Sequence, residues 1–138
     1  RLIAYSTSQG FISLHAHLYP VKGLNVIEIE AKRRWEVVFR DGNSWQLGIY
    51  VPENESIDDV KILEKHDCPE MFYLVRGRVV LVLSSGDELE EVEMEEGKIY
   101  IVECWHNAYR PEGSPGVALV VERPSVKTEY RPISEFKR

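Results

Sequence analysis

Residues 60–84 carry the sequence VKILEKHDCPEMFYLVRGRVVLVLS, which decides the fold of the chain. Its runs of apolar, β-branched and aromatic residues are separated by a turn that contains Pro69 and by a single glycine, Gly77. Short runs bounded by turn-forming residues are typical of β-strands. The segment therefore predicts consecutive strands at residues 60–66, 71–76 and 79–84.

The first of these runs alternates in a way that sets the direction of its polar side chains. Side chains two residues apart lie on the same face of a strand, so Glu64 and His66 should point the same way. After the second run, Gly77 supplies the backbone freedom that a tight turn needs. We therefore expect residues 71–84 to form a hairpin that turns at Arg76-Gly77-Arg78.

The rest of the chain repeats this pattern of short runs and turn residues. Helix signals are nearly absent, and only residues 56–59 and 134–137 could each form a single turn. Many short strands separated by turns indicate a β-sandwich or β-barrel, so the fold class predicted is all-β. The further strand-like runs are residues 11–18, 26–31, 35–40, 45–51, 98–104 and 117–122.

Size and charge argue against several classes of function. The 138 residues suit one domain, and no apolar run approaches the roughly 20 residues that a membrane-spanning helix needs. The net charge of −6 disfavours nucleic acid or an anionic membrane as a partner, because phosphate binding needs clustered Lys and Arg. Lys32, Arg33 and Arg34 do form a small basic cluster between two strand-like runs, and we interpret it as a solvated hairpin turn.

Cysteine usage and the N-terminal residues indicate the compartment. Two cysteines, Cys68 and Cys104, do not make a disulfide framework, and no signal peptide pattern is present. We therefore expect a soluble, cytoplasmic protein. The acidic residues are mostly Glu, and Gln and Asn are few, which favours a thermophilic source.

Four side chains form a constellation that suits a metal ion. Glu64, His66 and Glu70 lie within one strand and the turn after it, and His106 lies on a later strand. Imidazole and carboxylate groups that converge from neighbouring strands can bind a divalent transition metal, because imidazole suits Fe, Ni, Cu and Zn and carboxylate also suits Mn. The sequence therefore predicts a metal site at Glu64, His66, Glu70 and His106.

These residues resemble the motifs of the cupin superfamily. The first cupin motif has two His separated by one residue, then a Glu and a Gly, and here Glu64-Lys65-His66, Glu70 and Gly77 match its spacing, with Glu64 at the first His position. The second motif begins with Gly and ends with a His, roles filled by Gly97 and His106, at a shorter spacing and without the usual Pro-Gly. The motif region spans residues 58–122.

The resemblance implies a fold and a function. The fold is a single cupin-type jelly-roll barrel, a double-stranded β-helix, over residues 1–138, with Fe, Mn, Zn or Ni at the four residues named above. The function is action on a small polar organic molecule, a sugar derivative or a carboxylic acid, by isomerase, lyase or dioxygenase chemistry. The alternative is a non-catalytic or metal-free barrel that binds a small ligand. The pair Trp105-His106 also resembles a segment of ureidoglycolate lyases, which share this barrel.

Three features of the sequence stay open. His66-Asp67-Cys68 and Cys104-Trp105-His106 could form a structural zinc site, or the cysteines could be buried apolar residues. His15 and His17 form a second His pair on an alternating strand, at a domain edge or dimer contact or as a metal site. The N-terminal residues 1–51 exceed what a small barrel needs, so we expect some of them to cover an edge or to form a homodimer.

Overall fold

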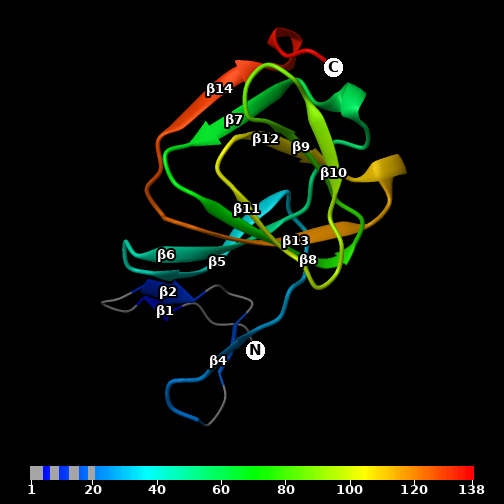
Figure 1. The fold of residues 1–138 in the computed structure, drawn as a ribbon. Helices are drawn as coiled ribbons and strands as arrows, with labels where there is room; N and C mark the ends of the chain where they lie inside the picture. The colour runs from blue at the N-terminus through cyan, green and yellow to red at the C-terminus, as the bar shows by residue number, and fades with distance from the viewer. Residues whose placement is uncertain (1–4, 7–9, 13–15, 19–20) are drawn as a thin grey trace.

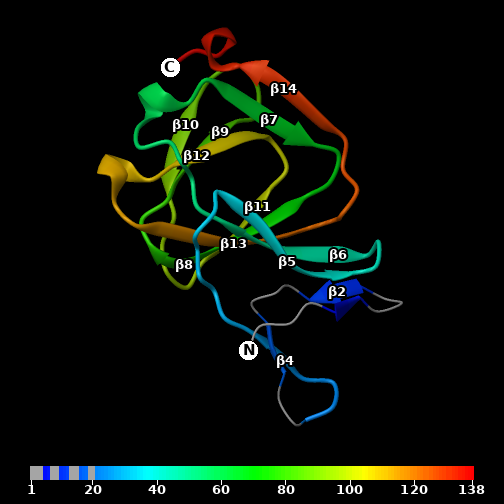
Figure 2. The same cartoon turned by 180° about the vertical axis from the view of Figure 1, so that it is seen from behind.

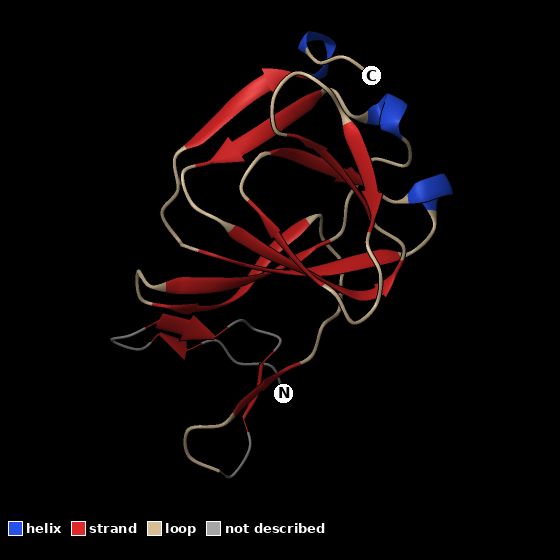
Figure 3. Ribbon diagram, in the orientation of Figure 1, coloured by secondary structure: helices blue, strands red, loops and turns tan. Residues whose placement is uncertain are grey.

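The structure is a computed structural model, and it describes residues 5–6, 10–12, 16–18 and 21–138. Two antiparallel sheets face each other across a shared core, and a separate pair of strands lies outside them (Figures 1 and 3). The all-β jelly-roll prediction is therefore confirmed. The strands at the N-terminus extend from one side of the barrel, and the C-terminus lies at the opposite side, as the reverse view also shows (Figure 2).

The first sheet has the strand order β1-β2-β5-β6-β13-β8-β11, and the second has the order β10-β9-β12-β7-β14. The first consists of β1 (Tyr5–Ser6), β2 (Gly10–Ile12), β5 (Trp35–Asp41), β6 (Trp45–Tyr50), β13 (Gly116–Glu122), β8 (Glu70–Gly77) and β11 (Ile99–Val102). The second consists of β10 (Glu90–Glu93), β9 (Val80–Ser84), β12 (Trp105–Tyr109), β7 (Ile62–His66) and β14 (Thr128–Pro132). The separate pair is β3 (Ala16–Leu18) and β4 (Asn25–Ile27).

In the part of the chain that the structure describes, helical structure is limited to short 3-10 turns. The described residues contain turns at Ile57–Asp59, Pro111–Gly113 and Ile133–Glu135. The first and last of these overlap the single turns that the sequence predicts. None of the helices in the described ranges is long and apolar enough to cross a membrane.

The core is built from alternate residues of the facing strands. Phe72 and Leu74 of β8, Leu81 of β9 and Val120 of β13 belong to one buried cluster. On β9 the intervening Val82 is also fully buried, because it packs with Leu63 and Phe136 in a second cluster. The outer face of the second sheet is thus covered by the C-terminal segment, which explains why β9 is apolar on both faces.

The first sheet is covered on its outer face by the segment that precedes β5. Val38, Ile49 and Val117 form a third buried cluster, against which Ile27 and Ile29 pack. Part of the N-terminal material therefore covers the barrel. The homodimer stays a prediction.

The predicted hairpin over residues 71–84 is wrong. β8 and β9 belong to different sheets, and Gly77 marks the point where the chain crosses from one to the other. At this crossing Gly77 has φ of +74° and pairs with Gly116, while the Arg78 N–H donates to the Pro115 carbonyl over 2.8 Å. A glycine between two apolar runs suits a hairpin and a crossing equally well. The strands separate because Leu74 of β8 and Leu81 of β9 meet across the core.

The basic cluster is not a hairpin turn either. β4 pairs with β3, while β5 pairs with β2 and β6, so residues 32–34 connect strands that are not partners. The segment enters the barrel beside β6, where the Arg34 carbonyl accepts a 2.9 Å hydrogen bond from the Val51 N–H. The three basic residues are exposed, as the sequence predicts, and Arg34 also lines a cavity of the barrel.

Gly77→Ala should destabilise the protein by about 1–3 kcal/mol, because alanine strains a positive φ and its Cβ would overlap the Pro115 carbonyl. Gly86→Ala is the matched control: a Cβ there meets nothing within 4 Å and the φ is not positive, so its effect should stay within about 0.5 kcal/mol. Urea unfolding of both variants measures the difference. Equal midpoints for Gly77→Ala and the wild type would contradict the assigned crossing.

Candidate metal centre

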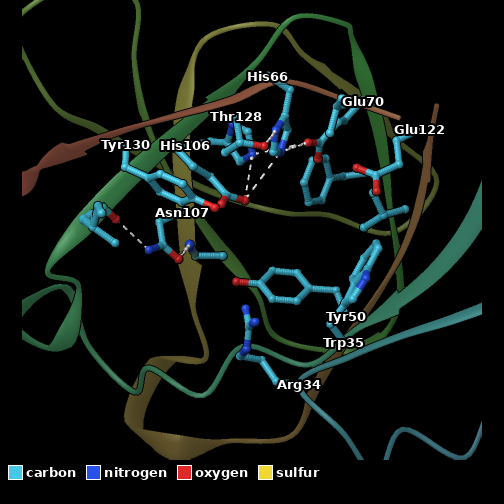
Figure 4. Close-up of a pocket in the computed structure, with 16 residues that line it drawn as sticks. Arg34, Trp35, Tyr50, His66, Glu70, His106, Asn107, Glu122, Thr128 and Tyr130 are labelled. Atoms are coloured by element: carbon cyan, nitrogen blue, oxygen red, sulfur yellow. Dashed lines mark hydrogen bonds and ion pairs between the residues drawn. The ribbon is translucent and has the colours of Figure 1, made fainter. Parts of the chain in front are cut away.

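The four side chains predicted to bind metal come together at one opening of the barrel. Glu64 and His66 lie on β7, and His106 lies on the neighbouring β12, directly opposite Glu64 in the strand register. Glu70 begins β8 in the other sheet and faces them across the opening. Glu64 and His66 share a face of β7, as their spacing predicts, and Figure 4 shows the imidazoles and the Glu70 carboxylate converging.

Each carboxylate of the cluster lies close to both imidazoles, and Glu64, His66 and His106 form a candidate ligand group whose ligand atoms lie within 4.8 Å of one another. The Glu64 Oε1 is 3.5 Å from the His66 Nε2 and 3.7 Å from the His106 Nε2. The Glu70 Oε1 contacts the His66 Nε2 and is 3.5 Å from the His106 Nε2. His66, His106 and Glu70 are nearly enclosed, with side-chain exposures of 9%, 7% and 4%, whereas Glu64 is 39% exposed. The cluster is therefore deep on three sides and open to solvent beside Glu64.

Hydrogen bonds to the far ring nitrogens orient both imidazoles. The Nδ1 of His106 lies 2.9 Å from the Cys104 carbonyl, and that of His66 lies 2.9 Å from the Thr128 Oγ1. A carbonyl can only accept, so the His106 Nδ1 carries the proton. In neutral His106 the Nε2 then presents a bare lone pair to the cluster, which is the tautomer that binds a metal.

Two buried atoms of the cluster lack hydrogen-bond partners among the described residues. They are the Nε2 of His106 and the Oε1 of Glu70. Each unpaired buried polar atom costs about 1–3 kcal/mol, and here two acceptors face each other. A cation between them would satisfy both. The donor set of two imidazoles and two carboxylates thus fits a divalent transition metal.

The charges around Glu64 keep it available as a ligand. Its hydrogen bond with His66 lowers the pKa of Glu64 most, and the nearby His106, His66 and Arg34 lower it further against the opposing effect of burial. A carboxyl with a lowered pKa is ionised at neutral pH, which is the form that coordinates a metal. Glu64 can therefore coordinate a metal at the position where the cupin motif has a histidine.

A fifth group, Glu122, was not predicted from the sequence. It lies on β13, and its carboxylate forms a second candidate ligand group with His66 and Glu70, all within 4.8 Å of one another. The Gln46 amide donates a 2.8 Å hydrogen bond to the Glu122 Oε2, which holds the carboxylate in place. No spacing rule could have found Glu122, because only the pairing of β13 with β8 brings it to the site.

The cysteines do not belong to the cluster. Among the described residues, neither candidate ligand group contains Cys68 or Cys104, so the Cys-His zinc site finds no support. β11 ends at Val102 in one sheet and β12 starts at Trp105 in the other, so Cys104 lies in the connection between the two sheets. Cys104 packs against the core and contributes its carbonyl to His106. His15 and the side chain of His17 lie outside the described residues.

A cavity of about 420 Å³ adjoins the cluster. Its walls include the aromatic residues Trp35, Tyr50 and Phe72, and Trp35 meets Tyr50 edge to face with ring centroids 6.5 Å apart. The Trp35 ring lies directly over Gly48 of the neighbouring strand, where a Cβ would overlap it. Gly48 therefore lets an indole form one wall of the cavity. The cavity has the size of a small-molecule site.

Comparisons with known proteins agree with this architecture. No protein-family model matches the chain. A segment of 69 residues is 38% identical to the 3-hydroxyanthranilate 3,4-dioxygenase of Jannaschia sp. (strain CCS1), covering 46% of this chain but only 38% of that protein. Hydroxypropylphosphonic acid epoxidase from S. wedmorenis, solved with fosfomycin, has a TM-score of 0.51 at 15% identity, covering 64% of this chain and 49% of that one. A cupin 2 domain-containing protein from Halorhodospira halophila has a TM-score of 0.49 at 17% identity, covering 80% and 71% of the two chains.

The barrel of two facing sheets, the spacing of the first motif and the sequence similarity to the dioxygenase define the class of protein. The chain is a member of the cupin superfamily. The resemblance inferred from the motifs is thus confirmed at the level of the superfamily, and the role of the four clustered residues stays a prediction.

Gly48→Ala should destabilise the barrel by about 1–3 kcal/mol, because the new methyl group displaces the Trp35 ring. In a Trp35→Ala background the same change should have almost no effect, since the ring it would meet is gone. Denaturant unfolding of the four proteins of this cycle measures the coupling. Equal losses from Gly48→Ala in both backgrounds would show that the strand itself, not the indole, requires glycine.

Proposed function

We propose that this cupin binds a divalent transition metal through Glu64, His66, Glu70 and His106 and acts on a small polar organic molecule in the adjoining cavity. The observation that carries the proposal is the buried His106 Nε2, which has no hydrogen-bond partner among the described residues and faces the buried Glu70 carboxylate. The candidate ions are Fe, Mn, Zn and Ni. Two imidazoles with a carboxylate suit iron in particular, and one structural neighbour is an Fe(II) HppE complexed with its substrate.

The bound metal would supply a Lewis acid that polarises an oxygen of the substrate. The chain's own residues orient and enclose the reactants. Thr128 and the Cys104 carbonyl hold the two imidazoles, while Phe72 shields the ring of His106 at a centroid distance of 6.0 Å. The exposed edge beside Glu64 leaves an approach from the cavity.

The cupin fold does not determine which reaction the protein catalyses. The local identity to a dioxygenase favours oxidative chemistry over isomerase or lyase chemistry, and the substrate would be a carboxylic acid or a sugar derivative. The likeness to ureidoglycolate lyases finds less support. Trp105, which carries it together with His106, packs against Phe136 and is not among the described residues that line the cavity.

The alternative is a metal-free barrel that binds a ligand without catalysis. Elemental analysis of protein purified without chelator separates the two functions. Near-stoichiometric metal supports the proposal, and metal-free protein with the cavity still able to bind a ligand supports the alternative.

His66→Ala and His106→Ala should each abolish tight metal binding, because each removes an imidazole from the cluster. The barrel should stay folded, since its core clusters contain neither residue. Elemental analysis and circular dichroism measure the two properties. His15→Ala, the same change at a histidine that is not part of the predicted metal motif, should alter neither. Unchanged metal content in the double variant His66→Ala/His106→Ala would refute the proposed site.

Thr128→Val should weaken metal binding by about 10- to 100-fold, because it removes the hydrogen bond to the His66 Nδ1 while keeping the shape of the side chain. Thr128→Ser keeps the hydroxyl and should restore most of the affinity, which a purely structural role would not require. Competition with a chelator of known affinity measures all three proteins. Equal affinity in the valine variant would show that His66 needs no such support.

A further inference from the structure

The cavity is strongly polarised along its length. Glu64, Glu70 and Glu122 line the end next to the candidate metal centre, and Arg34 is the one Arg or Lys among the described lining residues. Arg34 lies on the segment before β5, at the opposite side of the cavity in Figure 4. A cationic group therefore stands apart from the metal ligands and faces the same space.

The Arg34 guanidinium is available to a ligand. Its ion pair with Glu53 is long, at 4.0 Å, and both side chains are more than half exposed, so this pair contributes little. Its backbone is fixed, however, because the Arg34 carbonyl accepts the hydrogen bond from Val51. The side chain can thus reorient toward a ligand while the backbone of Arg34 stays in place.

Tyr50 adds a donor beside this cation. Its hydroxyl points into the cavity in Figure 4, and it has no hydrogen-bond partner among the described residues. Burial raises the pKa of Tyr50 most, and Glu64 raises it further while Arg34 lowers it. The phenol therefore stays protonated and can donate a hydrogen bond to a ligand in the cavity.

We propose that Arg34 and Tyr50 form a carboxylate-binding subsite, and that the substrate is a small monocarboxylate whose other end faces the Glu64, His66, Glu70 and His106 cluster. Guanidinium binds a carboxylate through paired N–H donors, and a phenol can add a third hydrogen bond. The proposal rests on the proposed function in one respect, that the far end of the ligand meets a metal centre. The binding of the carboxylate by Arg34 and Tyr50 does not depend on it.

The cavity also defines the body of this ligand and its charge. Trp35, Phe72 and Val120 are apolar residues of the cavity wall, which suits a flat or apolar body. Even with a divalent ion neutralising Glu64 and Glu70, a dianion such as phosphate would bring a second negative charge into a cavity that also holds Glu122, with one guanidinium among the described lining residues to balance it. A monoanion avoids that repulsion, so we infer a carboxylate rather than a phosphate.

Benzoate and its neutral isostere benzamide are the probes, titrated into the purified protein by calorimetry. The wild type should bind benzoate more tightly than benzamide. Arg34→Gln should weaken benzoate binding about tenfold and leave benzamide unchanged, because it removes one charge-assisted interaction. Arg33→Gln is the matched control, since it removes the same charge from an exposed neighbour that does not line the cavity and should change neither ligand. Tyr50→Phe should weaken benzoate binding about threefold to tenfold.

Repeating the titration after EDTA treatment separates this subsite from the metal. Benzoate held by Arg34 should still bind to metal-free protein with the same dependence on Arg34, whereas benzoate held by a metal should not. Dependence on Arg34 in a protein that never carries metal would support the subsite and refute the proposed function. Equal benzoate affinity in the wild type and Arg34→Gln, or no preference for benzoate over benzamide, would overturn the subsite.

Discussion

The structure depends on one constraint, the enclosure of two unpaired acceptors at the opening of the barrel. The His106 Nε2 and the Glu70 Oε1 lie 3.5 Å apart and are both buried. Neither has a hydrogen-bond partner among the described residues, and the Glu70 Oε1 is in contact with the His66 Nε2. In water each would be solvated, so burying them together opposes folding unless a cation lies between them. The chain keeps them there by strand pairing: β12 is held beside β7 and β9, and Glu70 is fixed where β8 begins against β11.

The supporting residues come from segments that surround this opening. Thr128 belongs to β14, which pairs with β7 along its whole length and so places its hydroxyl against His66. Glu122 and its partner Gln46 face each other in the register of β13 and β6. The C-terminal segment then returns over the outer face of the second sheet, where Phe136 closes the second core cluster. β14, which precedes this segment, is the edge strand of the second sheet and lies beside β7.

Local patterns predicted part of this arrangement and could not predict the rest. The period of two along a strand placed Glu64 and His66 on one face, and the spacing to Glu70 identified a carboxylate one turn later. Glu122, Thr128 and Tyr50 reach the site only through the order of strands in the sheets, which no short spacing encodes. The same limit explains the wrong hairpin, because residues 70–84 are apolar in both strands and each strand could have paired with the other.

Glu64 alters the charge of the site in a way that agrees with the polarity of the cavity. With histidine at that position, a divalent ion bound by three imidazoles and Glu70 would leave net positive charge at the opening, which by itself attracts an anion. With Glu64 and Glu70 as two carboxylate ligands, the charge of a divalent ion would be cancelled, and the carboxylate of Glu122 lies beside the proposed site. An anionic substrate would then gain little from the metal end, and its attraction would have to come from elsewhere in the cavity.

Arg34, at the other side of the cavity, is the cationic group among the described lining residues that could attract the anion. In the proposed metal-bound state, glutamate at position 64 would keep the metal end of the cavity near neutral, and Arg34 would hold the anion at the other side.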